Sequence, residues 1–211
     1  MRIEIVIYPG FDELDAIGPL EVLRQAQSLG APLETRLVSM AGGQEITASH
    51  GLRVFSEDRL AANGQPDLVI VPGGGWTARA KHGAWAEAQR PEVPGAFARL
   101  HRAGVTMTSV CTGAMLIAAS GILRGRHATT HHAVLDELRA QGVKLVDARV
   151  VDDGDVITAG GVTSGLDLAL WLVERFSGAA FARQVESALE YQLRGPVWRG
   201  REQAAPARQA G

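Results

Sequence analysis

Short apolar segments that end near glycine alternate along this chain with segments of helical character. Runs that are apolar or rich in β-branched side chains predict buried strands, and three of them occupy residues 3–8, 33–40 and 67–71. Helical composition or periodicity is found at residues 20–29, 94–102, 132–141, 162–173 and 179–191. Strands that alternate with helices predict an α/β fold: a three-layer sandwich with a mostly parallel sheet and helices on both faces.

Several boundaries follow from turn and breaker residues. Gly18 and Pro19 discourage a helix that runs through residues 11–19, so we expect the first helix to begin at Leu20. Residues 46–55 predict a hairpin or an irregular excursion, and residues 58–62 a short helix. Short strands are expected at residues 144–146, 148–151 and 156–158, with a hairpin turn at 152–155.

Residues 105–119 contain the single cysteine of the chain, at the junction of a predicted strand and a predicted helix. A side chain on such a sharp turn is pushed out of the sheet, as in a nucleophile elbow. Gly113 lets the backbone pass close to the turn. The start of the following helix favours a thiolate, so Cys111 is expected to have a depressed or strongly coupled pKa. The alternative is an inert, buried cysteine that only fills space.

Composition places the chain among ordinary globular proteins. It has 211 residues, 46% of them hydrophobic and 21% charged, which suits one sizeable core. We expect one domain over residues 1–195 and a C-terminal tail over 196–211 that packs on the surface or against a partner, or is mobile. The net charge of −2 gives no support for nucleic-acid or membrane binding. One cysteine and no secretory leader predict a cytoplasmic location.

Three segments with unusual turns leave predicted strands at the same edge of the sheet. They carry Asp15, the glycines at 73–75, and Cys111. Parallel α/β sheets bind ligands beyond the carboxyl ends of their strands. The sequence therefore predicts that these three segments meet and form a site.

The chain resembles the ThiJ/PfpI superfamily, and within it the isonitrile hydratase group. The matching segments are YPG at 8–10, LDAIGPLEV at 14–22, VPGGG at 71–75, VCTGA at 110–114, ATTH at 128–131 and GGVTSGLD at 160–167. The resemblance implies a flavodoxin-like fold similar to class I glutamine amidotransferases. The same pattern occurs in the amidotransferase-like domain of AraC-type regulators, but the chain is expected to end before a DNA-binding part.

The residue after the cysteine separates the groups of this superfamily. Peptidase and glyoxalase-like members usually have histidine there, whereas this chain has Thr112. Cysteine followed by threonine, with an upstream aspartate, is similar to the isonitrile hydratase group. The reaction that this resemblance implies is the addition of water to an isonitrile, which gives an N-substituted formamide without a cofactor. A redox or small-ligand sensor and a glyoxalase- or deglycase-like enzyme are the alternatives.

The resemblance and the residue types together suggest roles within the site. Cys111 would be the nucleophile, and Asp15 would donate a proton and later act as base. Thr112 would orient the substrate or water, while Gly74 and Gly75 would offer backbone N–H groups to developing negative charge. Asp15 could instead cap a helix, and the glycines could form only a tight turn.

No metal site is expected, because adjacent His131 and His132 point in different directions on a helix. The expected partners are a small isonitrile substrate and a second copy of the chain. The homodimer is an expectation from the family, because the segment that carries Asp15 lies at the edge where members commonly dimerise.

Overall fold

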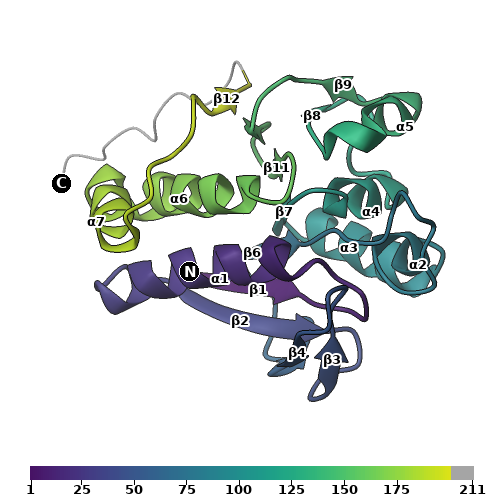
Figure 1. The fold of residues 1–211 in the computed structure, drawn as a ribbon, viewed down its shortest axis with the longest axis horizontal. Coiled ribbons are helices and arrows are strands. Elements are labelled where there is room, and N and C mark those ends of the chain that lie inside the picture. Colours follow the sequence, from purple (N-terminus) through teal and green to yellow (C-terminus); the bar gives the residue numbers. More distant parts are fainter. Residues whose placement is uncertain (201–211) are drawn as a thin grey trace.

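The structure of the protein is a computed structural model, in which residues 1–200 are described. In this part of the chain an eight-stranded sheet forms the centre of the molecule, and its neighbouring strands are parallel except for the β10–β11 pair. The strands in spatial order are β12 (Trp198–Arg199), β10 (Val150–Asp152), β11 (Val156–Ala159), β7 (Thr106–Ser109), β6 (Leu68–Val71), β1 (Arg2–Val6), β2 (Glu34–Ser39) and β5 (Asp58–Arg59). Figure 1 shows these elements along the chain.

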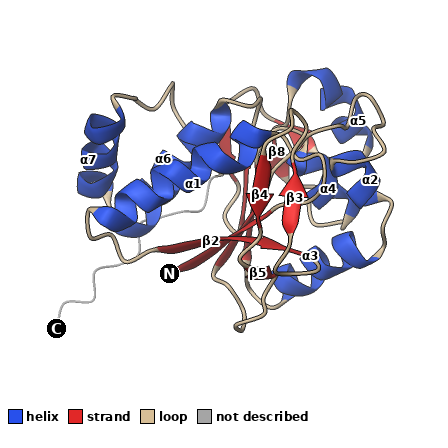
Figure 2. Ribbon diagram, turned by 60° about the horizontal axis from the view of Figure 1, so that its bottom comes forward, coloured by secondary structure: helices blue, strands red, loops and turns tan. Residues whose placement is uncertain are grey.

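Helices cover both faces of the sheet, as Figure 2 shows. One group packs together on one side: α1 (Glu13–Ser28), α6 (Ser164–Ser177) and α7 (Ala179–Leu189). The group on the other side contains α2 (Ala84–Ala88), α3 (Glu92–Arg102) and α4 (Gly113–Ala119). The predicted α/β sandwich with a mostly parallel sheet is therefore confirmed.

The first helix differs from the prediction. Helix α1 begins at Glu13 and continues through Gly18 and Pro19 to Ser28. Pro19 has no N–H to donate to the carbonyl of Asp15, and the loss of this hydrogen bond normally destabilises a helix. Packing compensates, because α1 lies along α6, and the ring of Pro19 rests against Gly165. The early start matters for function, since it puts Asp15 in the first turn of a helix.

The prediction of a short helix at residues 58–62 is wrong. Asp58 and Arg59 instead pair with β2 as the edge strand β5. Ala61 then adopts a left-handed backbone with φ of 58°, and its N–H donates to Glu4 Oε2 at 2.8 Å. Such a backbone does not continue a right-handed helix. The segment therefore turns back across the sheet.

Most of the other predicted elements are present, but one helix is divided and the ends of several elements differ. Residues 46–55 form the predicted hairpin, of β3 (Glu45–Thr47) and β4 (Arg53–Phe55). The helix expected at 132–141 divides into a 3₁₀ turn (His132–Val134) and α5 (Leu135–Ala140). Strand β8 (His127–Ala128) pairs with β9 (Lys144–Leu145) in a small separate sheet. Helix α2 was not predicted.

Part of the predicted tail joins the fold. Trp198 and Arg199 form β12, which pairs with β10 at the edge of the main sheet. Residues 201–211 lie outside the described residues. Within residues 1–200, no helix combines the length and the apolar character needed to cross a membrane.

Candidate active site

Cys111 lies on the sharp turn between β7 and α4, as predicted. Its backbone is in the left-handed region, with φ of 56°, which is uncommon for a residue other than glycine. Holding such a conformation costs on the order of 1–3 kcal/mol. The Cys111 N–H donates to the carbonyls of Ala159 (3.1 Å) and Gly160 (2.7 Å), and the Thr130 hydroxyl donates to the Cys111 carbonyl at 2.9 Å. These bonds hold the strained turn from both sides.

Gly113 is required where the elbow crosses the end of β6. A Cβ atom at this position would lie only 2.0 Å from the backbone oxygen of Val71. No side chain fits there unless the backbone moves. The glycine after Thr112 therefore has the predicted structural role: it lets the backbones of the elbow and of β6 approach closely.

Asp15 is fully buried in the first turn of α1. It does not cap the helix, because the N-cap is Asp12, whose side chain accepts from the Leu14 N–H. The Oδ2 atom of Asp15 accepts the Gly73 N–H at 2.8 Å. Its Oδ1 atom is buried and has no hydrogen-bond partner within the part of the chain described. The alternative interpretation of Asp15 as a helix cap is therefore wrong.

Thr112 is joined by a hydrogen bond to the glycine loop, residues 73–75. The Gly74 N–H donates to Thr112 Oγ1 at 3.0 Å, so this donor is already occupied. The expectation that Gly74 offers a free N–H to developing negative charge therefore does not hold in this arrangement. The N–H of Gly75 donates to no group among residues 1–200. Of the two predicted donors, Gly75 is the one that remains available.

Gly73 is packed between two of the three predicted catalytic side chains, those of Asp15 and Thr112. A Cβ atom on Gly73 would lie 2.5 Å from Thr112 Oγ1 and 3.0 Å from Asp15 Oδ2. Asp15, Thr112 and the glycine loop therefore meet at the carboxyl edge of the sheet, as the sequence predicts. Any side chain at 73 would fill the space between them.

Burial controls the ionisation of Asp15. It raises the pKa of this carboxyl from its ordinary value of 3.8 to about 8, and the nearby charge of Asp12 adds to the increase. The Gly73 N–H and the Cys111 thiol act in the opposite direction but are weaker. Asp15 is therefore mainly protonated at neutral pH and can donate a proton.

Burial also raises the pKa of the Cys111 thiol, and the negative charge of Asp15 raises it further. The Thr112 N–H at the helix start favours the thiolate, but its effect is smaller than that of burial. The expected depression of the pKa is therefore wrong, because desolvation exceeds the influence of the helix start. The two groups do influence each other, as expected for a coupled pair.

We expect alkylation of Cys111 to report this raised pKa. The rate with iodoacetamide should rise with a midpoint above that of an ordinary cysteine thiol, because the thiolate forms only at alkaline pH. In Asp15→Asn the midpoint should fall, since the carboxylate that opposes the thiolate is gone. Mass spectrometry of samples quenched at set times measures the alkylation rate of both proteins as a function of pH. A wild-type midpoint at or below the ordinary value would contradict the prediction.

The raised pKa of Asp15 also predicts a pH-dependent stability. The folded protein binds the Asp15 proton more tightly than the unfolded chain does. The contribution of this proton to the free energy of unfolding is therefore fully present below pH 3.8 and is lost as pH rises to about 8. The loss should approach at most about 1.4 kcal/mol per pH unit in this window. Urea unfolding of the wild type and of Asp15→Asn at several pH values measures it. If both free energies of unfolding change in parallel, Asp15 does not titrate in this range.

Sequence reasoning gave no role to several groups that build the site. Thr130 and Gly160 hold the elbow, and the Tyr8 hydroxyl donates to the backbone carbonyl of Pro72 beside the glycine loop. All three belong to segments on which the family resemblance rests, which was the available signal. Within residues 1–200, no group of three or more His, Cys, Asp or Glu side chains is placed to hold a metal ion.

Residues 1–175 match the family model described as DJ-1/PfpI family. The chain belongs to the DJ-1/PfpI family. It is 32% identical over 209 residues to isonitrile hydratase from Pseudomonas putida, an alignment that covers 98% of this chain and 86% of that protein. It is also 32% identical to the HTH-type transcriptional regulator CdhR from Pseudomonas aeruginosa over 85% of this chain, which spans about half (52%) of the regulator.

Solved structures of the DJ-1/PfpI family share the fold. A ThiJ/PfpI family protein from Pseudomonas syringae superimposes with a TM-score of 0.81 at 27% identity, over 92% of this chain and 76% of that one. DJ-1beta from Drosophila melanogaster gives a TM-score of 0.78 at 22% identity, covering 90% and 98% of the two chains. Proteins named isonitrile hydratase, transcriptional regulator and DJ-1beta are therefore all among those to which this chain is similar.

Proposed function

We propose that this DJ-1/PfpI protein hydrates isonitriles to N-substituted formamides, with Cys111 as nucleophile and no cofactor. The observation that carries the proposal is the pairing of Cys111, on its strained turn, with a buried Asp15 whose pKa is about 8. The relative from Pseudomonas putida that is named isonitrile hydratase supports this reaction. A protonated carboxyl beside a thiol provides both the acid and the nucleophile that the reaction requires.

In the first step, the S–H bond of Cys111 is added across the isonitrile carbon. Asp15 gives its proton to that carbon and takes the thiol proton, while the sulfur forms a bond to the carbon. The product is a thioimidate, R–N=CH–S, attached to Cys111. Because Asp15 exchanges one proton for another, it ends the step in its neutral form, which its buried position favours.

In the second step, water hydrolyses the thioimidate. Neutral Asp15 gives its proton to the substrate nitrogen and takes one from water as the water oxygen attacks the carbon. The C–S bond then breaks as the new hydroxyl group becomes the carbonyl, its proton passes to the sulfur, and the formamide R–NH–CHO is released. One water is consumed, and both Cys111 and Asp15 return to their starting forms.

Thr112 and Gly75 complete the proposed machinery. Thr112 Oγ1 accepts the Gly74 N–H, which leaves the hydroxyl proton available for substrate or water. The Gly75 N–H is available to stabilise the oxygen during attack by water. Both positions adjoin the loop that also holds Asp15 through Gly73.

Two of the alternatives that the sequence left open, an oxidation sensor and a glyoxalase-like enzyme, are less well supported. An oxidation sensor needs an accessible thiolate with a low pKa, whereas Cys111 is only 6% exposed and burial raises its pKa. Glyoxalase-like members usually have histidine after the cysteine, and this chain has Thr112. These observations favour the hydratase.

Incubation with a simple alkyl isonitrile tests the proposal directly. We expect the matching N-alkyl formamide to accumulate over many turnovers, detected by proton NMR at the formyl position. Boiled protein and buffer provide the background rate. Formation of formamide at no more than the background rate with several alkyl and aryl isonitriles would reject the proposed reaction.

We expect Thr112→Val to slow turnover about tenfold to a hundredfold. Valine keeps the size but removes the acceptor of the Gly74 N–H and the hydroxyl that orients the substrate, a loss of about 1–3 kcal/mol. Thr112→Ser is the matched control, because it retains the hydroxyl and should stay within about threefold of the wild type. Steady-state kinetics on purified variants measure both effects. Equal activities of the two variants would mean that the hydroxyl has no role.

A further inference from the structure

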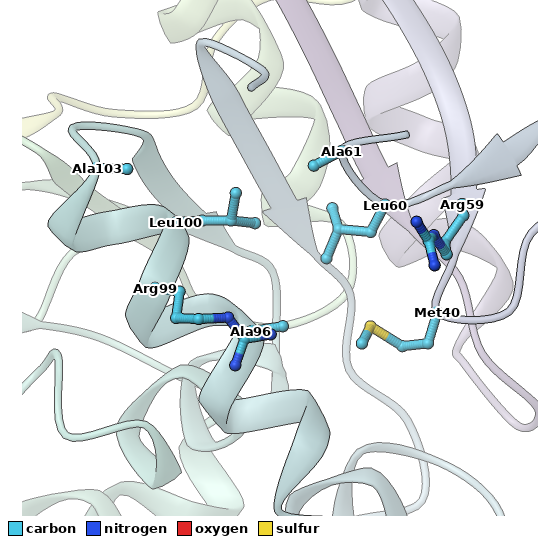
Figure 3. A pocket seen from close by; sticks show the side chains of 8 residues that line it. All are labelled: Met40, Arg59, Leu60, Ala61, Ala96, Arg99, Leu100 and Ala103. Atoms are coloured by element: carbon cyan, nitrogen blue, oxygen red, sulfur yellow. The ribbon is translucent and has the colours of Figure 1, made fainter. Parts of the chain in front are cut away.

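A cavity of about 480 Å³ opens on the face of the sheet covered by α3, away from the residues assigned to catalysis. Figure 3 shows its two walls. Helix α3 and Ala103 at its C-terminal end form one wall, and Met40 with Arg59 of β5 and the two residues after it forms the other. Eight residues line it: Met40, Arg59, Leu60, Ala61, Ala96, Arg99, Leu100 and Ala103. The volume lies in the range of sites that bind small molecules.

The lining separates into an apolar part and a cationic part. Leu60 and Leu100 point toward each other from opposite walls, and Ala61 and Ala103 extend this apolar part (Figure 3). The guanidinium groups of Arg59 and Arg99 point toward the space between the walls from the two sides (Figure 3). No acidic residue lines the cavity.

Among residues 1–200, the two arginines have no partner of opposite charge. Neither Arg59 nor Arg99 forms a salt bridge or a side-chain hydrogen bond with any group in residues 1–200. Other surface arginines, such as Arg36 and Arg126, do pair with carboxylates. Two unpaired guanidinium groups at one cavity produce a local positive potential that an anion would neutralise.

We propose that this cavity binds an amphiphilic carboxylate, of the kind represented by a medium-chain fatty acid. The carboxylate would lie between Arg59 and Arg99, since guanidinium groups match its two oxygens. The alkyl chain would lie along Leu60 and Leu100, where its CH₂ groups leave water. A purely inorganic anion would leave the apolar part unused, and an uncharged alkane would leave both arginines without a partner.

This site is separate from the proposed reaction. None of its eight lining residues is among Cys111, Asp15, Thr112 and the glycines that hold them. Helix α3, which forms one wall of the cavity, also packs against α4. Binding can therefore be measured without reference to turnover, and its failure would leave the hydratase proposal unaffected.

Isothermal titration calorimetry with octanoate tests the proposal on the full chain. We expect one site per chain, an affinity at least about tenfold higher for octanoate than for octanol, and no binding of octylamine. In the series from butanoate to octanoate, each added CH₂ should raise the affinity about two- to fourfold, because it buries more apolar surface. Cys111→Ala should bind octanoate as the wild type does.

Variants of the two arginines locate the carboxylate. Arg59→Gln and Arg99→Gln should each weaken octanoate binding about tenfold, whereas octanol binding should change little. Arg102→Gln is the matched control, because Arg102 is exposed on the same helix and does not line the cavity. Circular dichroism checks that each variant is folded. Equal affinities in the wild type and in both cavity variants, or no octanoate binding at millimolar concentration, would overturn the proposal.

Discussion

Cys111→Ala is expected to abolish isonitrile turnover, with a loss of more than about 10³-fold in kcat. The covalent route needs the sulfur to form the thioimidate, and alanine offers no nucleophile. The fold should persist, because the side chain is small and the Cys111 backbone is held by the carbonyls of Ala159 and Gly160 and by the Thr130 hydroxyl. Formamide production by the purified variant, measured by NMR, decides the outcome.

Alkylation of the wild type provides a matched control for this variant. Cys111 is the only cysteine in the chain, so turnover should fall in proportion to the fraction of protein that iodoacetamide has modified. Near-ultraviolet circular dichroism compares the packing of the variant and the wild type. Full activity in folded Cys111→Ala would end the covalent mechanism.

Asp15→Asn is expected to reduce turnover about 10²- to 10⁴-fold, or roughly 3–5.5 kcal/mol in the barrier. Asparagine keeps the shape and can still accept the Gly73 N–H, but it cannot exchange protons with substrate and thiol. The wild-type kcat/KM should also decline as pH rises through about 8, because Asp15 then loses the proton that it must donate. This decline should be absent in the residual activity of Asp15→Asn.

Asp12→Asn is the matched control for Asp15. It removes a carboxylate close to the same pair, while asparagine still serves as N-cap of α1. We expect turnover at neutral pH to stay within about threefold of the wild type, since Asp12 acts only through its charge. A loss in Asp12→Asn as large as in Asp15→Asn would mean that Asp15 has no special role in proton transfer.

The elbow and its surroundings could be read from local sequence. A β-branched strand, then Cys111 and Thr112, then Gly113 and a helical run specify a strand–turn–helix by local preferences alone. Alternation of strands and helices along the chain was sufficient for the fold class. Because parallel strands share one carboxyl edge, the convergence of Asp15, the glycine loop and Cys111 also followed from the order of the elements.

Other features depended on neighbours that are distant in sequence. Helix α1 passes through Pro19 because α6 packs against it, and Asp58 pairs with β2 although its local sequence suggests a helix. These outcomes could not be read from local preference, since the partner surfaces lie far along the chain.

The protonation state of the site was likewise decided by tertiary structure. The sequence showed the residue types of Cys111 and Asp15. It also showed that a helix begins directly after the turn that carries Cys111. The depth at which the two side chains are buried was not, and desolvation is the largest influence on both pKa values. The sequence by itself determined which groups meet and on which scaffold. Only the packed structure decided that both hold their protons at neutral pH, because the cost of a buried charge depends on everything that surrounds it.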